Sequence, residues 1–316
     1  MKRKLCGTLK ERWLPITFEL SELGINLFMD QQPLTFTIWD VGHGLCVWIQ
    51  TPKGHHHWID CGAATENDFS PAEHVNSKHG VKAIDYLIIS HPDADHLRDL
   101  PNLVNKIGKP RTLQRNKTLP PDEKYKSGEL EYQEHFKNLD TTYNAAVLRE
   151  VDPQNPEFNG GVLIKDFSNS FSDTIKGNNT SVVMFYAYAD WLFIFPGDIE
   201  DIGWTTLWQT KKAQIEPLIT KSKYRVLVAP HHGRQSGYSQ GMMDNLKPHV
   251  TIVSDVAGQS PTDQRFRTNP LGLTLTVAPE TKPKSVKYLS TKAGGRIQFE
   301  ISSDNTYKLH QYEYWS

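Results

Sequence analysis

The chain has 316 residues and a formal net charge of −1, with 38% hydrophobic residues, so it can form one large domain or two ordinary ones around a sizeable core. The balanced charge excludes a protein that binds nucleic acid or acidic membranes through its overall field, although local patches remain compatible with it. Its three cysteines lack zinc-finger spacing. The sequence contains neither an apolar run long enough to span a bilayer nor a signal-peptide pattern. We therefore expect a cytoplasmic protein without membrane contact.

The pattern predicts one main domain, residues 34–316, after an N-terminal extension, residues 1–33. A charged, loosely helical segment near residues 117–150 departs from the strand pattern around it, and we interpret it as an insertion. The residues of the extension and of the insertion indicate no chemistry, but each is a candidate surface for a protein partner.

Three short apolar runs open the main domain and predict an antiparallel meander. They cover residues 34–40, 45–50 and 57–60, separated by turns that contain Gly or Pro. Asp40 and His43 follow the first run and Asp60 ends the third, so we expect these polar side chains at one end of the meander. His55 to His57 lie at the opposite turn, where a solvated turn is a simpler interpretation than a metal site.

The most informative stretch runs from Ser90 to His96, SHPDADH, and contains two histidines and two carboxylates. It follows an apolar run, residues 83–89, that predicts a buried strand, and it precedes a leucine-rich pattern that predicts a helix over residues 97–107. Asp95 is expected at the N-cap of that helix. Imidazole and carboxylate groups are ligands that Zn²⁺ and Mn²⁺ accept, so this loop predicts a metal site rather than a capped turn with surface charges.

A basic run follows the predicted helix. It consists of Lys106, Lys109, Arg111, Arg115 and Lys117. Two interpretations stay open: an ordinary solvated edge, which is the simpler one, and a surface for a polyanion near the site.

Two later strands also end in residues of metal-ligand type. The apolar run 192–196 is followed by Asp198. The run 224–230 is followed by His231 and His232. Strands that end at the same edge of a sheet bring such residues together, and open α/β folds bind their ligands at that edge. We therefore expect Asp198 and the histidine pair to meet the SHPDADH loop.

These motifs resemble the metallo-β-lactamase fold, and within it the soluble metallohydrolase domain of ComEC-type DNA-uptake proteins. The matching pieces are WDVGHG (39–44), WIDCG (58–62), IISHPDADH (88–96), NTS (179–181), FPGD (195–198), VAPHHG (228–233) and residues 291–297. They fall between about residues 34 and 302, so the resemblance covers most of the chain. It implies an αββα sandwich of two mixed β-sheets flanked by helices, with metal ligands gathered at one edge.

The resemblance also implies roles for the site residues. The implied ligands are His91 and Asp93 for a first ion, Asp95 and His96 for a second, Asp198 as the bridge, and His231 or His232 to complete the second site. Asp40 and Asp60 would support these ligands from behind. Because Asp93 stands where many members of the fold have histidine, the first site is rich in oxygen. We expect two divalent ions, Mn²⁺ or Zn²⁺ with Mg²⁺ as a third candidate, and better activation by Mn²⁺ than by Zn²⁺.

The implied function is that of a metal-dependent phosphodiesterase, most specifically a nuclease, with nucleic acid or a nucleotide as substrate. Asp95 would orient or deprotonate the attacking water, and His232 or His43 would protonate the leaving oxygen. Arg234 and Lys292 are candidate phosphate contacts. Two alternatives remain: an acyl hydrolase of the same fold acting on a lactone or amide, and a binding module with a degenerate site.

Overall fold

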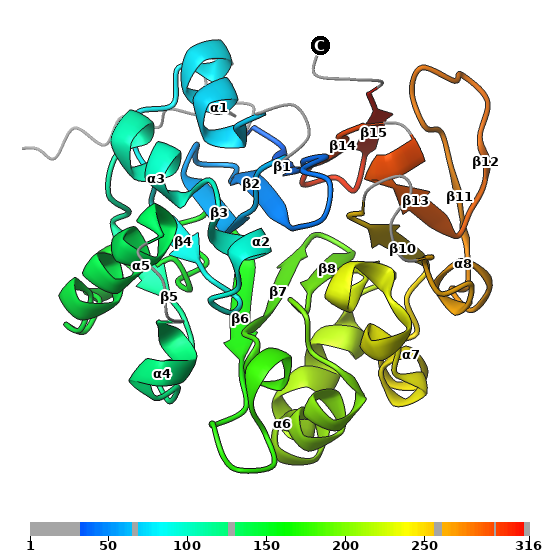
Figure 1. Cartoon of the computed structure of the whole chain (residues 1–316). Coiled ribbons are helices and arrows are strands. Elements are labelled where there is room, and N and C mark those ends of the chain that lie inside the picture. The colour runs from blue at the N-terminus through cyan, green and yellow to red at the C-terminus, as the bar shows by residue number, and fades with distance from the viewer. Residues whose placement is uncertain (1–31, 65–68, 126–129, 256–260, 294, 313–316) are drawn as a thin grey trace, which may run out of the picture. The chain divides into compact units, whose positions relative to one another are not determined.

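The computed structural model describes residues 32–64, 69–125, 130–255, 261–293 and 295–312. In this part of the chain two mixed β-sheets pack face to face, and helices cover their outer faces (Figure 1). The αββα sandwich that the resemblance implies is therefore confirmed. The predicted extension, residues 1–33, lies outside the described residues except for its last two.

The first sheet has seven strands in the order β15-β14-β1-β2-β3-β4-β5. Its strands are β1 Leu34–Ile38, β2 Cys46–Gln50, β3 His56–Cys61, β4 Tyr86–Ile88, β5 Thr112–Gln114, β14 Ile297–Ile301 and β15 Tyr307–Gln311. The strands β1, β2 and β3 form the predicted antiparallel meander, whereas β3, β4 and β5 run parallel. The parallel strands bring their C-terminal ends to one edge of the sheet.

The second sheet has six strands in the order β13-β10-β9-β8-β7-β6. Its strands are β6 Leu163–Phe167, β7 Val183–Tyr188, β8 Trp191–Phe195, β9 Tyr224–Val228, β10 Val250–Val253 and β13 Tyr288–Ser290; β11 Leu273–Leu275 and β12 Lys284–Val286 form a separate pair. The strands β7 and β8 form a hairpin, and β8, β9, β10 and β13 run parallel. Their C-terminal ends therefore also share an edge.

Apolar side chains that alternate along the strands fill the space between the two sheets. Phe36 of β1 is fully buried there, and its ring stacks on Phe193 of β8 with 4.1 Å between centroids. Each such buried side chain contributes about 1.5–3 kcal/mol to folding.

The α-helices are α1 Pro71–His79, α2 Ala94–Leu97, α3 Leu100–Asn102, α4 Pro121–Lys124, α5 Glu131–Thr142, α6 Asp201–Lys221, α7 Gln240–Leu246 and α8 Arg265–Thr268. Of the helices in the described residues, none combines the length and the apolar composition needed to cross a membrane.

The helix predicted over residues 97–107 is broken into three pieces. The helices α2 and α3 are single turns, and Leu103–Ile107 continue as a π-helical segment. Pro101 lies in the first turn of α3, where its missing N–H is tolerated, so the break falls just before it. The N-cap of α2 is Asp93 and not Asp95 as predicted, because the Asp95 side chain contacts histidines at the edge of the sheets.

A buried ion pair attaches the predicted insertion near residues 117–150 to the first sheet. Arg115 follows β5, is only 4% exposed, and donates from Nε to Oδ1 of Asp140 on α5 at 2.6 Å. Lys124 and Tyr125 donate to the other carboxylate oxygen. The solvated-edge interpretation of the basic run is therefore wrong for Arg115, whose partner lies 25 residues further along the chain.

The solvated-turn interpretation is wrong for His57. This residue is fully buried in β3, and its Nδ1 lies 3.3 Å from the hydroxyl of Tyr186. Because side chains alternate along a strand, His57 faces the same way as Ile59, into the space between the sheets. Burial lowers the pKa of His57 to about 3, so the ring is neutral at neutral pH.

Candidate metal centre

Four side chains from the two sheets converge at the shared edge of the sandwich. Asp95, His96, Asp198 and His232 each offer one ligand atom within 4.8 Å of the others. Oδ2 of Asp95 lies 3.1 Å from Nε2 of His232. Oδ1 of Asp198 lies 3.2 Å from Nε2 of His96. Two carboxylates and two imidazoles at these separations form a candidate site for a divalent ion.

Backbone hydrogen bonds between strand ends explain how distant parts of the chain meet here. The N–H of Val182 donates to the carbonyl of Ser90 at 2.9 Å, and the N–H of His231 donates to the carbonyl of Gly197 at 3.3 Å. These bonds join the ends of β4, β7, β8 and β9. His231 and His232 both have positive φ, 50° and 54°, a sparsely populated conformation that reverses the chain and brings both rings to the edge.

A second group of ligand-type atoms surrounds Asp198. Nε2 of His91 lies 3.9 Å from Oδ2 of Asp198 and 3.9 Å from Oδ2 of Asp93. Nε2 of His231 also lies 3.9 Å from Oδ2 of Asp198. Ligands that bind one zinc ion tetrahedrally lie about 3.3 Å from each other, so small side-chain movements would let these groups share an ion. Asp198 lies between both groups, where the sequence predicts a bridging ligand.

The geometry distinguishes the two adjacent histidines that the sequence left open. His232 lies with Asp95, His96 and Asp198 in the tighter group. Nε2 of His231 belongs to the looser group, 3.9 Å from Oδ2 of Asp198, while its Nδ1 contacts Oγ of Ser236 at 2.8 Å and Oε1 of Glu200 at 3.4 Å. The geometry therefore favours His232 over His231 as the ligand that completes the second site.

A buried carboxylate behind the site orients two of the histidines. Oδ2 of the fully buried Asp60 accepts hydrogen bonds from Nδ1 of His96 and from the hydroxyl of Ser90, each at 2.7 Å. Its Oδ1 accepts the backbone N–H of Ser90 at 2.7 Å. The Ser90 hydroxyl in turn lies 3.0 Å from Nδ1 of His91. Because both Nδ1 atoms are engaged, Nε2 of each ring is left to face the site.

Two buried nitrogen atoms in the site make no hydrogen bond within the described part of the chain. They are Nε2 of His91 and Nε2 of His96. A buried polar atom without a partner costs about 1–3 kcal/mol, so such atoms need an explanation. Both lie beside the carboxylate of Asp198, and a cation between them would satisfy nitrogen and oxygen together. The residues present therefore fit a divalent metal ion.

Opposite charges shift the pKa values in the site. Burial opposes ionisation of Asp198, but the charges of His232 and His96 outweigh it and hold the pKa of Asp198 well below its usual range. Burial also opposes protonation of His232, but Asp198 and Asp95 outweigh it and raise the pKa of His232 to about 9. The central carboxylate is therefore ionised at neutral pH, as a metal ligand must be, whereas His232 has to release its proton when an ion binds.

The remaining predicted residues lie at the rim or behind it. Nη2 of Arg234 lies 3.4 Å from Nδ1 of His43, and Nε2 of His43 lies 3.3 Å from Oδ2 of Asp95. The Asp40 carboxylate accepts a backbone N–H in the turn that carries His43, so it shapes that turn. Lys292 is exposed in the turn that follows β13, at the C-terminal edge of the second sheet. The structure thus brings His43 and Arg234 to the metal ligands and places Lys292 on the same edge.

Three side chains that contact the predicted ligands received no role from the sequence. Ser90 directly precedes His91, and that adjacency is the only signal that could have indicated it. Glu200 and Ser236 contact His231 from loops, and loops have no periodicity that would single out one polar residue. Sequence patterns therefore indicated the ligands better than the groups that orient them.

Replacing Ser90 by alanine is expected to weaken metal binding about 10- to 100-fold, the usual cost of removing a hydrogen-bonded group behind a ligand. The variant leaves His91 without its Nδ1 partner but keeps the bond between Asp60 and His96. Calorimetric titration of the metal-free protein with Mn²⁺ measures the affinities. Ser77→Ala, an exposed position on α1, serves as the control, and equal affinities in all three proteins would contradict the prediction.

The comparison with protein families agrees with this architecture. A family model described as the Metallo-beta-lactamase superfamily matches residues 39–240. A solved diphosphatase of the PhnP family is 14% identical, with a TM-score of 0.41, over 85% of this chain and 98% of that chain. A mutant of the β-hydroxylase CmlA is also 14% identical, with a TM-score of 0.40, over 70% of this chain and 46% of that chain. No curated protein sequence matches the chain.

Proposed function

Because the chain belongs to the metallo-β-lactamase superfamily, a fold in which hydrolysis is metal-dependent, we propose that it is a phosphodiesterase that cleaves nucleic acid. The observation that carries this proposal is a row of cations on the edge that holds the candidate metal ligands. They are Lys117 after β5, Arg234 after β9 and Lys292 after β13. A polyanion could follow this row across the site, whereas a small neutral acyl substrate would not need it.

The three cations come from both sheets: Lys117 follows a strand of the first sheet, and Arg234 and Lys292 follow strands of the second. Lys117 lies beside Asn116, whose amide donates to the carbonyl of Thr180 at 2.8 Å. The next residue, Ser181, accepts the backbone N–H of Asp198 through its hydroxyl. These buried hydrogen bonds join the loop after β5 to the loop that carries the central carboxylate, so the two loops are held next to each other.

The side chains around Asp95 support the predicted roles in phosphodiester hydrolysis. A divalent ion bound in the site would lower the pKa of a water molecule and neutralise phosphoryl oxygens. Asp95 is the carboxylate that both His43 and His232 contact, so it can orient or deprotonate an attacking water. The Nε2 atom of His232 would be occupied by the ion, so His43 is the residue left to protonate the leaving oxygen. Arg234, next to His43, can hold a phosphate oxygen.

The oxygen-rich first site supports the choice of metal. Asp93 lies beside His91 and offers a carboxylate oxygen, where a histidine would offer a nitrogen ligand. Its side chain is 32% exposed. Carboxylate oxygen suits Mn²⁺ and Mg²⁺ better than it suits Zn²⁺, so we keep Mn²⁺ as the better activator and two ions as the expected count.

The resemblance of the motifs to ComEC-type domains supports nucleic acid as the substrate. A protein partner that binds through residues 1–33 or 117–150 also remains our proposal.

Arg234→Ala is expected to lower kcat/KM for phosphodiesters about 10- to 100-fold, because it removes a hydrogen bond to a charged group worth about 1.5–3 kcal/mol. The measurement is Mn²⁺-dependent hydrolysis of bis(p-nitrophenyl) phosphate and of a labelled oligonucleotide. Arg149→Ala is the matched control, because this exposed arginine lies near Lys53 and His55 at the opposite end of the first sheet.

Two outcomes would overturn the proposed function, and a third would overturn the choice of metal. Hydrolysis of a lactone or amide that does not depend on Arg234, without hydrolysis of phosphodiesters, would identify an acyl hydrolase. A protein that binds no ion and hydrolyses nothing would identify a binding module. Activity with Zn²⁺ equal to or above that with Mn²⁺ would contradict the role given to Asp93.

A further inference from the structure

Two exposed cations lie together where α8 packs against the start of β13. They are Arg267 and Lys287, and we call them the cation pair. The guanidinium of Arg267 lies over the ring of Tyr288, 4.4 Å from its centroid, and Nζ of Lys287 donates to the backbone carbonyl of Thr268 at 3.2 Å. Each cation is thus held by the residue next to the other one, so two like charges are kept close to each other.

The acidic residues nearby are paired with other cations. Residues 261–293 contain six lysines and arginines but only two carboxylates, although the whole chain has a formal net charge of −1. Asp263 pairs with Arg265 at 2.6 Å, and Glu280 pairs with Lys284 at 2.8 Å. Within the described residues the cation pair therefore has no carboxylate of its own, and an anion from outside the chain would relieve the repulsion between its charges.

Hydrogen bonding and stacking hold α8 against the loop that carries the histidine ligands. The N–H of Asp263, just before α8, donates to the carbonyl of Gly233 at 2.9 Å, and Gly233 directly follows the candidate ligand His232. The guanidinium of Arg265 lies 3.8 Å from the centroid of Tyr238, five residues further along the same segment. The helix that carries Arg267 is therefore attached beside the metal centre.

The strand register gives the distance from the cation pair to the metal centre. Thr251 of β10 pairs with Leu227 of β9 on one side and with Tyr288 of β13 on the other. Strands lie about 4.8 Å apart and rise about 3.3 Å per residue, so Tyr288 lies roughly 10–15 Å from the histidines that follow β9. At about 3.4 Å per phosphate along one strand of a duplex, this distance spans about three to four phosphates.

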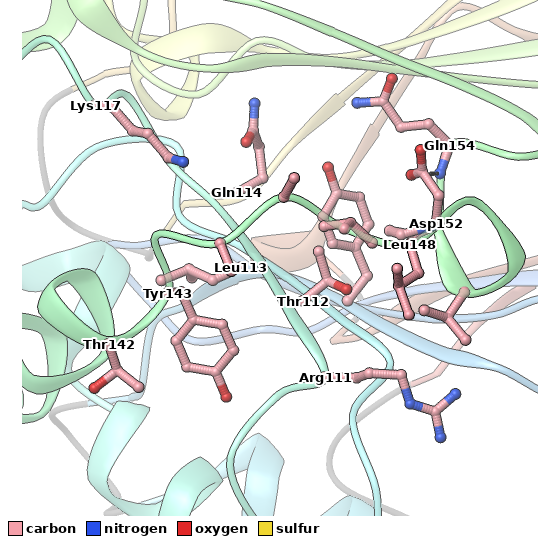
Figure 2. A pocket seen from close by; sticks show the side chains of 16 residues that line it. Arg111, Thr112, Leu113, Gln114, Lys117, Thr142, Tyr143, Leu148, Asp152 and Gln154 are labelled. Carbon is pink, nitrogen blue, oxygen red and sulfur yellow. Dashed lines mark hydrogen bonds between the residues drawn. The ribbon is translucent and has the colours of Figure 1, made fainter.

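The opposite flank of the sandwich, beside β5, is less suited to a polyanion. A pocket of about 770 Å³ lies there, lined by β5 and by parts of residues 142–154 (Figure 2). Its two cations, Arg111 and Lys117, lie apart in Figure 2, and Arg111 pairs with Asp85 at 3.1 Å. Asp152 adds a negative charge to the wall of the pocket. A polyanion that extends beyond the metal centre therefore meets more unpaired positive charge at the junction of α8 and β13.

The chemistry of the cation pair suits phosphate. A guanidinium presents a planar fork that matches two phosphate oxygens, and the ring of Tyr288 beneath it holds that plane in place. Lys287 adds a point charge and also lines a cleft of about 440 Å³, together with the exposed Ser285, whose hydroxyl can donate to a phosphate oxygen. The surface beside the pair is thus hollowed, which leaves room for a strand of nucleic acid.

We propose that the cation pair binds the phosphate backbone of the nucleic acid substrate, a few nucleotides from the bond that the metal centre cleaves. The part of the substrate that is not cleaved then lies over the flank formed by α8 and β13. This inference rests on the proposed function for the identity of the ligand, but its residues are separate from the metal ligands and its test does not need hydrolysis.

The test removes the two charges and compares the result with the same loss elsewhere. The double variant is Arg267→Ala with Lys287→Ala. The matched control is Arg149→Ala with Lys53→Ala, two exposed cations at the opposite end of the first sheet. A third protein, Arg267→Lys with Lys287→Arg, exchanges the residues and keeps the charge. Fluorescence anisotropy with Mn²⁺ measures the Kd of a labelled phosphorothioate DNA of about 12 nucleotides, which resists hydrolysis, between about 50 and 200 mM salt.

We expect the double variant to bind the DNA about tenfold or more weakly at the lower salt concentration. The slope of log Kd against log salt should fall by between about 0.7 and 1.4, the contribution of one to two phosphate contacts to a single strand. The control and the exchange variant should keep the slope of wild type within about 0.3. Hydrolysis of bis(p-nitrophenyl) phosphate, which is too small to reach the cation pair, should stay within about twofold of wild type in all variants.

The outcomes separate this inference from the proposed function. If the wild type hydrolyses phosphodiesters but the double variant binds DNA like the control, the surface is refuted and the function stands. If the exchange variant loses as much affinity as the double variant, the loss does not come from charge, and the surface is also refuted. If poly-glutamate binds the wild type at least as tightly as DNA does and loses that binding in the double variant, the surface belongs to an acidic protein. If the wild type hydrolyses nothing but the double variant still loses affinity and slope, the surface stands and the proposed chemistry fails.

Discussion

Asp198→Asn is expected to lower metal-dependent hydrolysis by about 10³-fold or more and to reduce the amount of bound metal. The carboxylate lies within 3.9 Å of Nε2 of His91, His96, His231 and His232, so it is the one group shared by both sets of candidate ligands. Asparagine keeps the size but removes the charge that neutralises an ion. A loss of about 4 kcal/mol of transition-state stabilisation corresponds to that factor. Metal content after dialysis and the rate with bis(p-nitrophenyl) phosphate measure the two effects.

The control for Asp198 is Asp244→Asn, which makes the same chemical change at an exposed position on α7. It should keep the metal content and rate of wild type. An Asp198→Asn protein that retains both would mean that the convergence of strand ends is not the active site. The same result would remove the basis for every role assigned to the histidines.

Gly62→Ala is expected to lower kcat/KM about 100-fold while the protein stays folded. A Cβ atom at this position would lie 2.7 Å from the carbonyl oxygen of Asp95 and 2.8 Å from that of Leu45, closer than real Cβ atoms approach oxygen. The backbone of Asp95 would have to move, and a misplacement of about 1 Å in a catalytic group typically costs about 100-fold. Steady-state kinetics and the midpoint of urea unfolding measure activity and stability separately.

The matched control is Gly241→Ala on α7, where the nearest atom to a new Cβ is Oγ of Ser239 at 3.6 Å. Alanine fits there and favours the helix by up to about 1 kcal/mol. A Gly62→Ala protein as active as this control would show that the Asp95 loop tolerates displacement, and would weaken the role of Asp95 as base or water ligand.

The strand pattern and the polar residues at strand ends were sufficient to predict the edge at which the site lies, whereas the αββα architecture came from the resemblance to a known fold. Apolar runs that end in SHPDADH, in Asp198 and in the histidine pair predicted one edge, and the structure brings those residues together there. Local signals succeeded because each motif is continuous in sequence and lies directly after a strand. The resemblance to a known fold also supplied the roles of the individual ligands.

The errors share one physical cause, which is dependence on partners far away in the chain. Arg115 appears as one of a row of surface cations in the sequence, but Asp140 of α5 buries its guanidinium. His57 belongs to a tract of three histidines, but the second sheet covers it. Asp95 has the position of an N-cap, but it is directed toward His232, which lies 137 residues away. In each case a tertiary contact outweighs a local preference.

The candidate ligands are divided between the two sheets of the sandwich. His91 and His96 follow a strand of one sheet, whereas Asp198 and His232 follow strands of the other. An ion held by both groups would cross-link the two halves of the fold, in addition to any chemistry that it supports. Since an unfolded chain cannot present these groups together, resistance to heat and to proteases should depend on how fully the protein is loaded, and cells short of the metal would lose the protein itself as well as its activity.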